Sequence, residues 1–394
     1  MTDFAKKALL PAGLNDVLPP DAEVEVSAVE RLMDVFSGHG YQRVKPPLIE
    51  FEESLLAGSG AAMAEESFRL MDPVSQRMMC LRPDMTLQVA RIATTRLVGA
   101  PRPLRLRYAG QVLRVRGSQL RPERQFGQVG AEIIGVADAG ADAEVILMAI
   151  EALADLGIPS LSVDLGMPPL VPAACAGYGI DDATATELRQ ALDRKDAAAV
   201  DAIGAAIAGS AASIFAGLLA AAGPAADAMA RLDDLDLPPA AATERAALAA
   251  VVNRVAAAAP DLTVTVDAVE NRGFEYHTGV TFTFFAVGVR GELGRGGRYQ
   301  AGDGEPATGL TLFMDTVLRA MPAPAPERRV YVADNLPAEA GARLRGEGWI
   351  TVVGYEDGDG EAEARRLDCT HVLIDGRPVA VAVDGNPINS SGEE

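Results

Sequence analysis

Arg124-Gln-Phe-Gly-Gln-Val-Gly-Ala-Glu132 is the stretch of sequence that says most about the fold. If it forms a β-strand, alternation of side chains places Gln128, Gly130 and Glu132 on one face. The residues between them form a second face that is mostly apolar. Such a strand offers one face to a core and the other to polar chemistry, and we expect the missing side chain of Gly130 to let a ligand approach. A solvated strand face would give the same pattern.

Strand-like and helix-like segments surround this stretch. We expect helices over 21–37, 84–97, 141–156 and 312–320, and strands over 78–81, 104–116, 124–136, 163–168, 263–269 and 280–287. The glycine-rich run Gly294-Arg-Gly-Gly-Arg-Tyr299 predicts a hairpin turn. An alanine-rich region over about 175–260 predicts an inserted helical region. A Pro-Ala run at 321–327 predicts a boundary between a domain over 1–322 and a small α/β domain over 328–394.

The charge balance bears on possible partners. The 394 residues carry a net charge of −20, from 35 basic and 55 acidic side chains. Because Lys and Arg supply most of the affinity for nucleic acid, a chain this acidic argues against a nucleic-acid partner. The acidity would also be explained by a need for solubility alone.

Cysteine content and hydropathy predict a cytoplasmic protein. Cys80, Cys175 and Cys369 have neither the spacing of a zinc site nor that of a disulfide framework. The first seven residues have no apolar signal core, and no apolar run is long enough to span a bilayer. We therefore expect a reduced protein without a membrane partner, a metal or a cofactor.

Two further segments carry residues suited to binding a small molecule. In Leu81-Arg-Pro-Asp-Met-Thr86, Asp84 and Thr86 stand at a strand-to-helix corner, where they can accept hydrogen bonds from an ammonium group or simply cap the helix. In Asn271-Arg-Gly-Phe-Glu-Tyr-His-Thr-Gly279, the arginine can hold a carboxylate, and the tyrosine and histidine can pack on a ring. An ordinary turn into the next strand would use the same residues.

Taken in order, these segments resemble those of histidyl-tRNA synthetases, a family of class II synthetases. The resemblance runs from Pro11 to the helix near Leu318. It implies an α+β fold, in which helices flank an antiparallel sheet, and a dimer. It also implies a histidine pocket: Asp84, Thr86 and Gln128 for the ammonium, Arg272 for the carboxylate, Glu132 for the imidazole N–H, and Tyr276 and His277 beside the ring.

The sequence departs from that family where ATP should bind. The family's second motif reads Arg-x-Glu, whereas this chain has Arg114-Val115-Arg116. The third motif ends in an arginine that holds the phosphates, and Thr316 stands in its place. Adenylate formation needs cations against the developing phosphate charge, so we predict a degenerate ATP site and no catalytic residues. The tail is also too short and too acidic for the family's anticodon-binding domain.

The combination of a retained amino-acid pocket and a degenerate ATP site resembles that of a related family, the regulatory subunits of ATP phosphoribosyltransferase. That resemblance implies a subunit that binds free histidine and joins a short-form catalytic subunit in a hetero-oligomer. It implies histidine feedback on the first step of histidine biosynthesis. The alternatives are a divergent active histidyl-tRNA synthetase and a histidine-dependent ligase acting on something other than tRNA. Exchange of pyrophosphate into ATP in the presence of histidine separates these hypotheses.

Overall fold

The computed structural model describes residues 9–56, 63–117, 121–207, 211–270, 276–355 and 359–381. The chain divides into two compact units, Met1–Pro322 and Ala323–Glu394, and each has apolar clusters of its own. None of the helices formed by the described residues has the length and apolar character that a membrane span requires.

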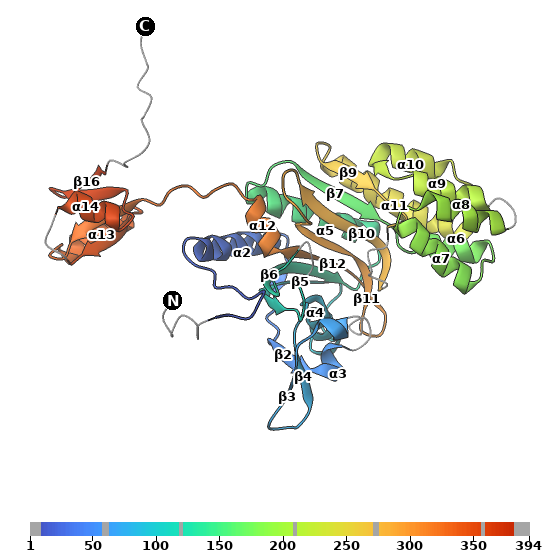
Figure 1. Ribbon diagram of the computed structural model, residues 1–394, viewed down its shortest axis with the longest axis horizontal. Coiled ribbons are helices and arrows are strands. Elements are labelled where there is room, and N and C mark those ends of the chain that lie inside the picture. Colours follow the sequence, from blue (N-terminus) through green and yellow to red (C-terminus); the bar gives the residue numbers. More distant parts are fainter. Residues whose placement is uncertain are drawn as a thin grey trace, which may run out of the picture. The chain divides into compact units, whose positions relative to one another are not determined.

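A large, mainly antiparallel sheet forms the centre of the first unit, and within the described residues it has nine strands (Figure 1). In spatial order they are β1 (Gln42–Arg43), β5 (Leu104–Leu113), β6 (Gln125–Ile134), β12 (Glu305–Phe313), β11 (Gly294–Ala301), β10 (His277–Ala286), β7 (Leu161–Gly166), β9 (Thr263–Val266) and β8 (Gly223–Pro224). Only the pairs β1–β5 and β7–β9 are parallel. The predicted α+β class is confirmed.

Helices cover both faces of the central part of this sheet. They are α2 (Asp21–Gly38), α5 (Ala139–Asp155) and α12 (Met314–Ala320) on one face and α4 (Thr86–Thr95) on the other. Val129 and Ile133 of β6 lie in the core beneath the first three helices. Phe126 of the same strand belongs to the core that contains Val89 of α4. The alternation predicted for β6 is therefore confirmed.

A helical region lies between β7 and β9 in the sequence, and these two strands are neighbours in the sheet. Its helices are α6 (Leu170–Gly177), α7 (Asp182–Asp193), α8 (Ala197–Ala206), α9 (Ala211–Ala220), α10 (Ala225–Asp233) and α11 (Pro239–Ala258). Asp181 begins α7 by accepting the N–H groups of Ala183 and Thr184 at 3.1 and 3.0 Å. Figure 1 shows these helices gathered at the β7–β9 end of the sheet.

A small antiparallel sheet lies beside α4. It consists of β2 (Ile49–Phe51), β4 (Met78–Leu81) and β3 (Arg69–Met71), in that spatial order, and the short helix α3 (Glu52–Leu55) follows β2. Because β4 leads through 82–85 into α4, this sheet fixes where α4 begins (Figure 1).

The second unit is a small α/β structure. Its elements are β13 (Arg329–Ala333), α13 (Ala338–Gly346), β14 (Ile350–Gly354), α14 (Gly360–Arg366), β15 (His371–Ile374) and β16 (Arg377–Ala380). The strand order is β14-β13-β15-β16, and only β16 is antiparallel to its neighbour. Val330, Val332, Leu344 and Trp349 form one of its buried clusters.

The hairpin turn predicted over 294–299 is wrong, because these residues form most of the central strand β11. Close packing explains the glycines. A Cβ on Gly296 would lie 2.1 Å from the carbonyl oxygen of Gly309 and 2.4 Å from the ring of Phe282. A Cβ on Gly294 would lie 2.5 Å from the carbonyl oxygen of Thr311. Glycine is therefore needed here for contact across the sheet and not for a turn.

Candidate functional site

Four adjacent strands, β5, β6, β12 and β11, build the floor of the candidate site. Their register aligns side chains in rows across the sheet. One row contains Tyr108, Gly130, Thr311 and Arg295, and the next contains Leu106, Glu132, Gly309 and Gly297. Since residues two apart on a strand share a face, both rows face the same side of the sheet. The two glycines of the second row leave space for other side chains: the Glu132 carboxylate lies over Gly309, and the ring of His277 lies over Gly297.

Glu132 is fully buried and is held by two tyrosines. Its Oε1 accepts a hydrogen bond from the hydroxyl of Tyr108 at 3.2 Å, and its Oε2 accepts one from Tyr299 at 3.0 Å. Burial raises the pKa of Glu132 to about 8, although the tyrosine hydrogen bonds act in the opposite direction. A Cβ on Gly309 would lie 1.7 Å from Oε2, so the carboxylate occupies space that only glycine leaves free.

A second polar group joins β6 to the start of α4. Asp84 Oδ1 accepts the N–H of Thr86 at 2.8 Å, and Oδ2 accepts Nε2–H of Gln128 at 2.9 Å. Gln128 Oε1 accepts the N–H of Met85 at 3.1 Å. The hydroxyl of Thr86 lies 3.0 Å from that of Tyr108. The carboxylate of Asp84 is thus fixed in position by the strand behind it.

A cavity of about 330 Å³ opens above this floor. Its volume is at the lower end of the range of roughly 300–1,000 Å³ typical of small-molecule sites. It is lined by Met63, Glu66, Asp84, Thr86, Leu87, Arg114, Tyr276, His277, Arg295, Gly296, Gly297, Tyr299, Gly309, Leu310, Thr311 and Phe313. The rings of Tyr276 and His277 are stacked, with their centroids 4.3 Å apart. The wall therefore combines an aromatic pair with charges of both signs.

The structure brings most of the predicted pocket residues together. Asp84, Thr86, Tyr276 and His277 line the cavity. Gln128 and Glu132 are fully buried directly behind that lining, so Gln128 positions Asp84. Arg272 lies outside the described residues.

The expectation that a ligand approaches at Gly130 is wrong. A Cβ there would lie 2.4 Å from both Cζ and the hydroxyl oxygen of Tyr108. The missing side chain makes room for this tyrosine ring, which in turn holds Glu132.

Sequence reasoning missed four residues of the site: Tyr108, Tyr299, Thr311 and Arg295. The hydroxyls of Tyr108 and Thr311 lie 3.0 Å apart, although their residues are far apart in sequence. Two of the missed residues, Tyr299 and Arg295, fall in the segment interpreted as a turn. Had that segment been assigned to a strand, alternation would have placed both on the face of Gly297.

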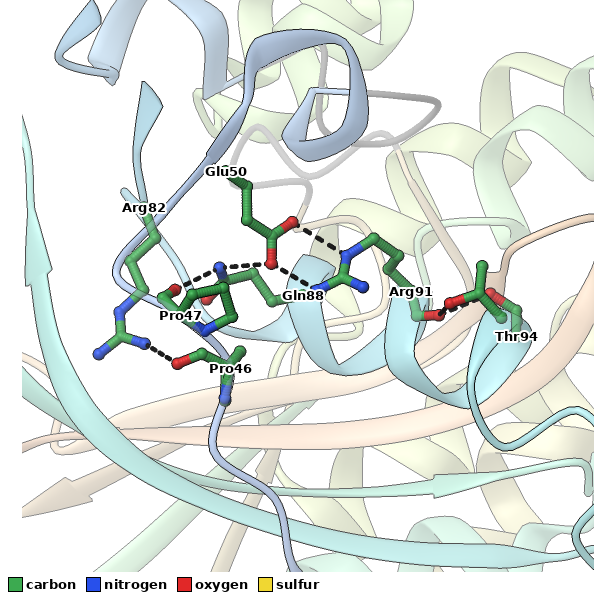
Figure 2. Close-up of polar contacts among 8 residues, drawn as sticks. Pro46, Pro47, Glu50, Arg82, Gln88, Arg91 and Thr94 are labelled. Carbon is green, nitrogen blue, oxygen red and sulfur yellow. Dashed lines mark hydrogen bonds and ion pairs between the residues drawn. The ribbon is translucent and has the colours of Figure 1, made fainter. Parts of the chain in front are cut away.

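A polar network secures α4, whose first residue is Thr86. Figure 2 shows Glu50 accepting hydrogen bonds from Gln88, at 2.9 Å, and from Arg91. Gln88 also donates to the carbonyl oxygen of Pro47 at 2.8 Å. Arg82 donates to the carbonyl oxygen of Pro46 at 3.2 Å (Figure 2). Both ends of the Pro46–Glu50 segment are therefore tied to the corner that presents Asp84.

The residues of the predicted degenerate ATP site lie beside this cavity. Arg114 lines it and also a second cavity of about 270 Å³, which Arg116 lines as well. Arg114 Nε lies 3.3 Å from Glu66 Oε2. Thr316 is buried, and its hydroxyl lies 3.4 Å from Asp315 Oδ2.

The acidic neighbour of Thr316 is already paired with cations. Asp315 Oδ2 lies 2.9 Å from Nε of Arg121 and 3.8 Å from Nη2 of Arg319. The Arg121 guanidinium carbon also lies 3.9 Å from the ring centroid of Phe313 and 4.8 Å from that of Phe126. These contacts give Arg121 a structural role in the space between the two rings.

Comparisons with known proteins agree with this architecture. Residues 13–317 match the family model described as Histidyl-tRNA synthetase. The chain is 61% identical to the "ATP phosphoribosyltransferase regulatory subunit" of Paramagnetospirillum magneticum, covering 95% of this chain and 98% of that protein. It is 55% identical to the protein of the same name from Rhodospirillum rubrum, covering 96% and 98%.

Solved structures show the same fold. An "ATP phosphoribosyltransferase regulatory subunit/histidyl-tRNA synthetase" from Bacillus halodurans matches with a TM-score of 0.78 and 24% identity, covering 91% of this chain and 96% of that one. A histidyl-tRNA synthetase from Nostoc sp. PCC 7120 matches with a TM-score of 0.77 and 18% identity, covering 93% and 91%. The predicted class II synthetase-like fold is confirmed.

Proposed function

The chain belongs to the family of ATP phosphoribosyltransferase regulatory subunits, and on this premise we propose that its cavity binds free histidine and conveys that signal to a catalytic partner. It is a regulatory subunit in histidine biosynthesis, and close relatives support the prediction that it is not itself the catalyst. Feedback requires only that histidine bind two states of the assembly with unequal affinity.

The observation that carries this proposal is the placement of two carboxylates around one cavity. Asp84 lines it and accepts the ammonium of the ligand, together with the hydroxyl of Thr86. Glu132 lies behind Gly309, which lines the cavity. A carboxylate has about four lone-pair sites, so Glu132 can accept an imidazole N–H in addition to its two tyrosine hydroxyls. Tyr276 and His277 supply an aromatic wall for the ring.

The residues around Thr316 support the proposal that the chain does not form an adenylate. Asp315 is paired with Arg121, and Thr316 contributes a hydroxyl where a phosphate would need a cation. This arrangement argues against the alternative of a divergent active histidyl-tRNA synthetase.

The assembly is also part of the proposal. The catalytic partner is a short-form ATP phosphoribosyltransferase, and the chain self-associates as a dimer in the cytoplasm. Leu48, Met71, Val74 and Met78 of the small sheet and its turns are large, exposed apolar side chains that support a protein interface there. The net charge of −20 argues against nucleic acid as a partner.

Calorimetry with free histidine tests the pocket. We expect Glu132→Ala to weaken histidine binding by about 10- to 100-fold, because the hydrogen-bond acceptor of the imidazole N–H is lost. Glu187→Ala, which removes an exposed carboxylate of α7, is the matched control and should bind like the wild type. Unchanged affinity in Glu132→Ala would refute the assignment of the imidazole to Glu132. In the reconstituted complex, histidine should inhibit the partner and Glu132→Ala should relieve that inhibition.

Restoring the acid of the second motif should not restore adenylation. Arg116→Glu recreates the Arg-x-Glu pattern, yet Thr316 still supplies no cation for the phosphates. We expect pyrophosphate exchange into ATP to stay at background in both the wild type and this variant, with histidine present. Robust exchange by the wild type would favour an active synthetase over a regulatory subunit.

A further inference from the structure

The three parallel strands of the second unit form a small doubly wound sheet. β13 has β14 on one side and β15 on the other. Leu344 of α13 packs on one face of β13 with Val330. Ala364 of α14 packs on the opposite face with Tyr331. In open sheets of this kind, ligands bind outside the carboxyl ends of the strands, at the point where the strand order reverses.

A cavity of about 440 Å³ lies at that edge of the sheet. Its volume falls within the range of roughly 300–1,000 Å³ typical of small-molecule sites. The residues that line it follow β13 and β14, begin α14 or belong to β15. The charged ones among them are Asp334, Asp359 and Glu361, and the described lining contains neither lysine nor arginine. The cavity is therefore acidic.

Tyr331 presents a polar group to this cavity. Its side chain lines the cavity although the residue is only 7% exposed. Tyr331 stands opposite Val352 in the sheet, yet its hydroxyl reaches Gly354, where a Cβ would lie 2.0 Å from that oxygen. The ring thus points along the sheet toward the carboxyl ends of the strands. Within the part of the chain that the structure describes, the hydroxyl makes no hydrogen bond, so it is available to a ligand.

The carboxylates of the cavity suit an organic cation. Asp334 has neither a hydrogen bond nor an ion pair among the described residues. Asp359 Oδ1 accepts the N–H of Glu361 at 3.0 Å, which leaves further lone pairs on its carboxylate. In the described ranges, no three His, Cys, Asp or Glu side chains are close enough to hold a metal ion. The lining also includes Val372 and Ile374, which can pack against an alkyl chain.

We propose that this cavity binds the primary ammonium group of an alkylamine. Asp334 supplies the opposite charge, and the hydroxyl of Tyr331 accepts an ammonium N–H. Tyr355 also lines the cavity and is 85% exposed, so its ring can pack against the cation. The net charge of −20 raises the concentration of cations around the protein. This site lies within the second unit and is independent of the proposed histidine pocket.

Calorimetry on the full chain tests the site with three probes: putrescine, N-acetyl-lysine amide and tetramethylammonium. We expect saturable binding of putrescine, weakened by added sodium chloride because the attraction is electrostatic. Tetramethylammonium carries the charge without an N–H and should bind at least about fivefold more weakly. N-acetyl-lysine amide identifies the source of the ammonium group. Binding as tight as that of putrescine would assign the site to a lysine side chain of a partner, and weaker binding would assign it to a free amine.

Two conservative variants test the residues. Tyr331→Phe should weaken putrescine binding at least about fivefold, yet should unfold in urea like the wild type because the hydroxyl has no protein partner to lose. Asp334→Asn should weaken binding by about three- to tenfold. Glu187→Gln removes the same charge from an exposed position of α7 and should bind putrescine like the wild type. All three variants should bind histidine normally.

Three results would overturn the proposal. They are a wild type without saturable putrescine binding, unchanged binding in Tyr331→Phe, and equal losses in Asp334→Asn and Glu187→Gln. The last result would mean that putrescine responds only to the net charge of the chain. Each would leave the proposed histidine pocket untouched, because that pocket is tested with a different ligand and different variants.

Discussion

Gly309→Ala is expected to displace the Glu132 carboxylate, to destabilise the first unit by about 3 kcal/mol and to abolish histidine binding. The new Cβ would lie 1.7 Å from Glu132 Oε2 and 2.4 Å from Cδ. The carboxylate cannot simply move aside, because Glu132 is fully buried and Tyr108 and Tyr299 hold its two oxygens. Urea unfolding gives the change in stability, and calorimetry gives the change in histidine affinity.

A double variant distinguishes this collision from a general intolerance of alanine in β12. Glu132→Ala removes the atoms that the new methyl group meets, so Gly309→Ala should be much less destabilising in that background. We expect the two changes to deviate from additivity by at least about 1 kcal/mol. Gly99→Ala is the control, since a Cβ at Gly99 would have nothing within 4 Å. Strictly additive effects would show that Gly309 and Glu132 are not in contact.

The sequence could predict the part of the site in which side chains alternate between the two faces of a single strand. Residues 125–134 form one strand with a buried apolar face, so alternation alone separates Val129 and Ile133 from Gln128 and Glu132. The corner that carries Asp84 and Thr86 was predictable for a similar reason. There the transition from strand to helix is local, and the Asp84 carboxylate accepts the N–H of Thr86.

The part that the sequence could not predict depends on neighbours across the sheet. Gly130 and Gly309 are glycines because of Tyr108 and Glu132, which belong to other strands. In a single sequence, such glycines look the same as glycines that permit a turn. The same ambiguity caused the error over 294–299, where contact with the neighbouring strands, and not a positive φ, requires glycine.

Which residues contact the ligand also depends on how deeply each side chain is buried, and the alternation of residues along a strand does not predict that burial. Gln128 and Glu132 share a face with the cavity, yet both are fully buried behind its lining. Gln128 therefore acts through Asp84, to which it donates a hydrogen bond of 2.9 Å. The resemblance to histidyl-tRNA synthetases supplied the set of residues, and the structure separates Gln128, which supports Asp84, from the residues that line the cavity.

Glu132→Gln is expected to remove a large pH dependence of stability. The pKa of Glu132 is raised from 4.5 to about 8 in the folded protein, chiefly by burial. Between these values the folded state binds more protons than the unfolded state, so stability falls as pH rises from about 4.5 to about 8. The full shift corresponds to roughly 4–5 kcal/mol at 1.36 kcal/mol per pKa unit. At pH 9 the variant should therefore be the more stable protein, as measured by urea unfolding across this range.

Glu144→Gln makes a control with the opposite sign, because the pKa of Glu144 is lowered, first by its hydrogen bonds with Arg105. That carboxylate stabilises the fold above its unfolded pKa, so the variant should be less stable than the wild type at neutral pH. The difference in stability between the two proteins should disappear on acidification, because the wild type then loses this contribution. The pKa values of Tyr108 and Tyr299 are raised well above 10, so neither tyrosine titrates in the range tested. A difference between Glu132→Gln and the wild type that stays constant from pH 5 to pH 9 would mean that Glu132 is ionised throughout. Its burial would then be offset by the two tyrosine hydroxyls, and ionised Glu132 would be ready to accept the imidazole N–H at any pH in this range.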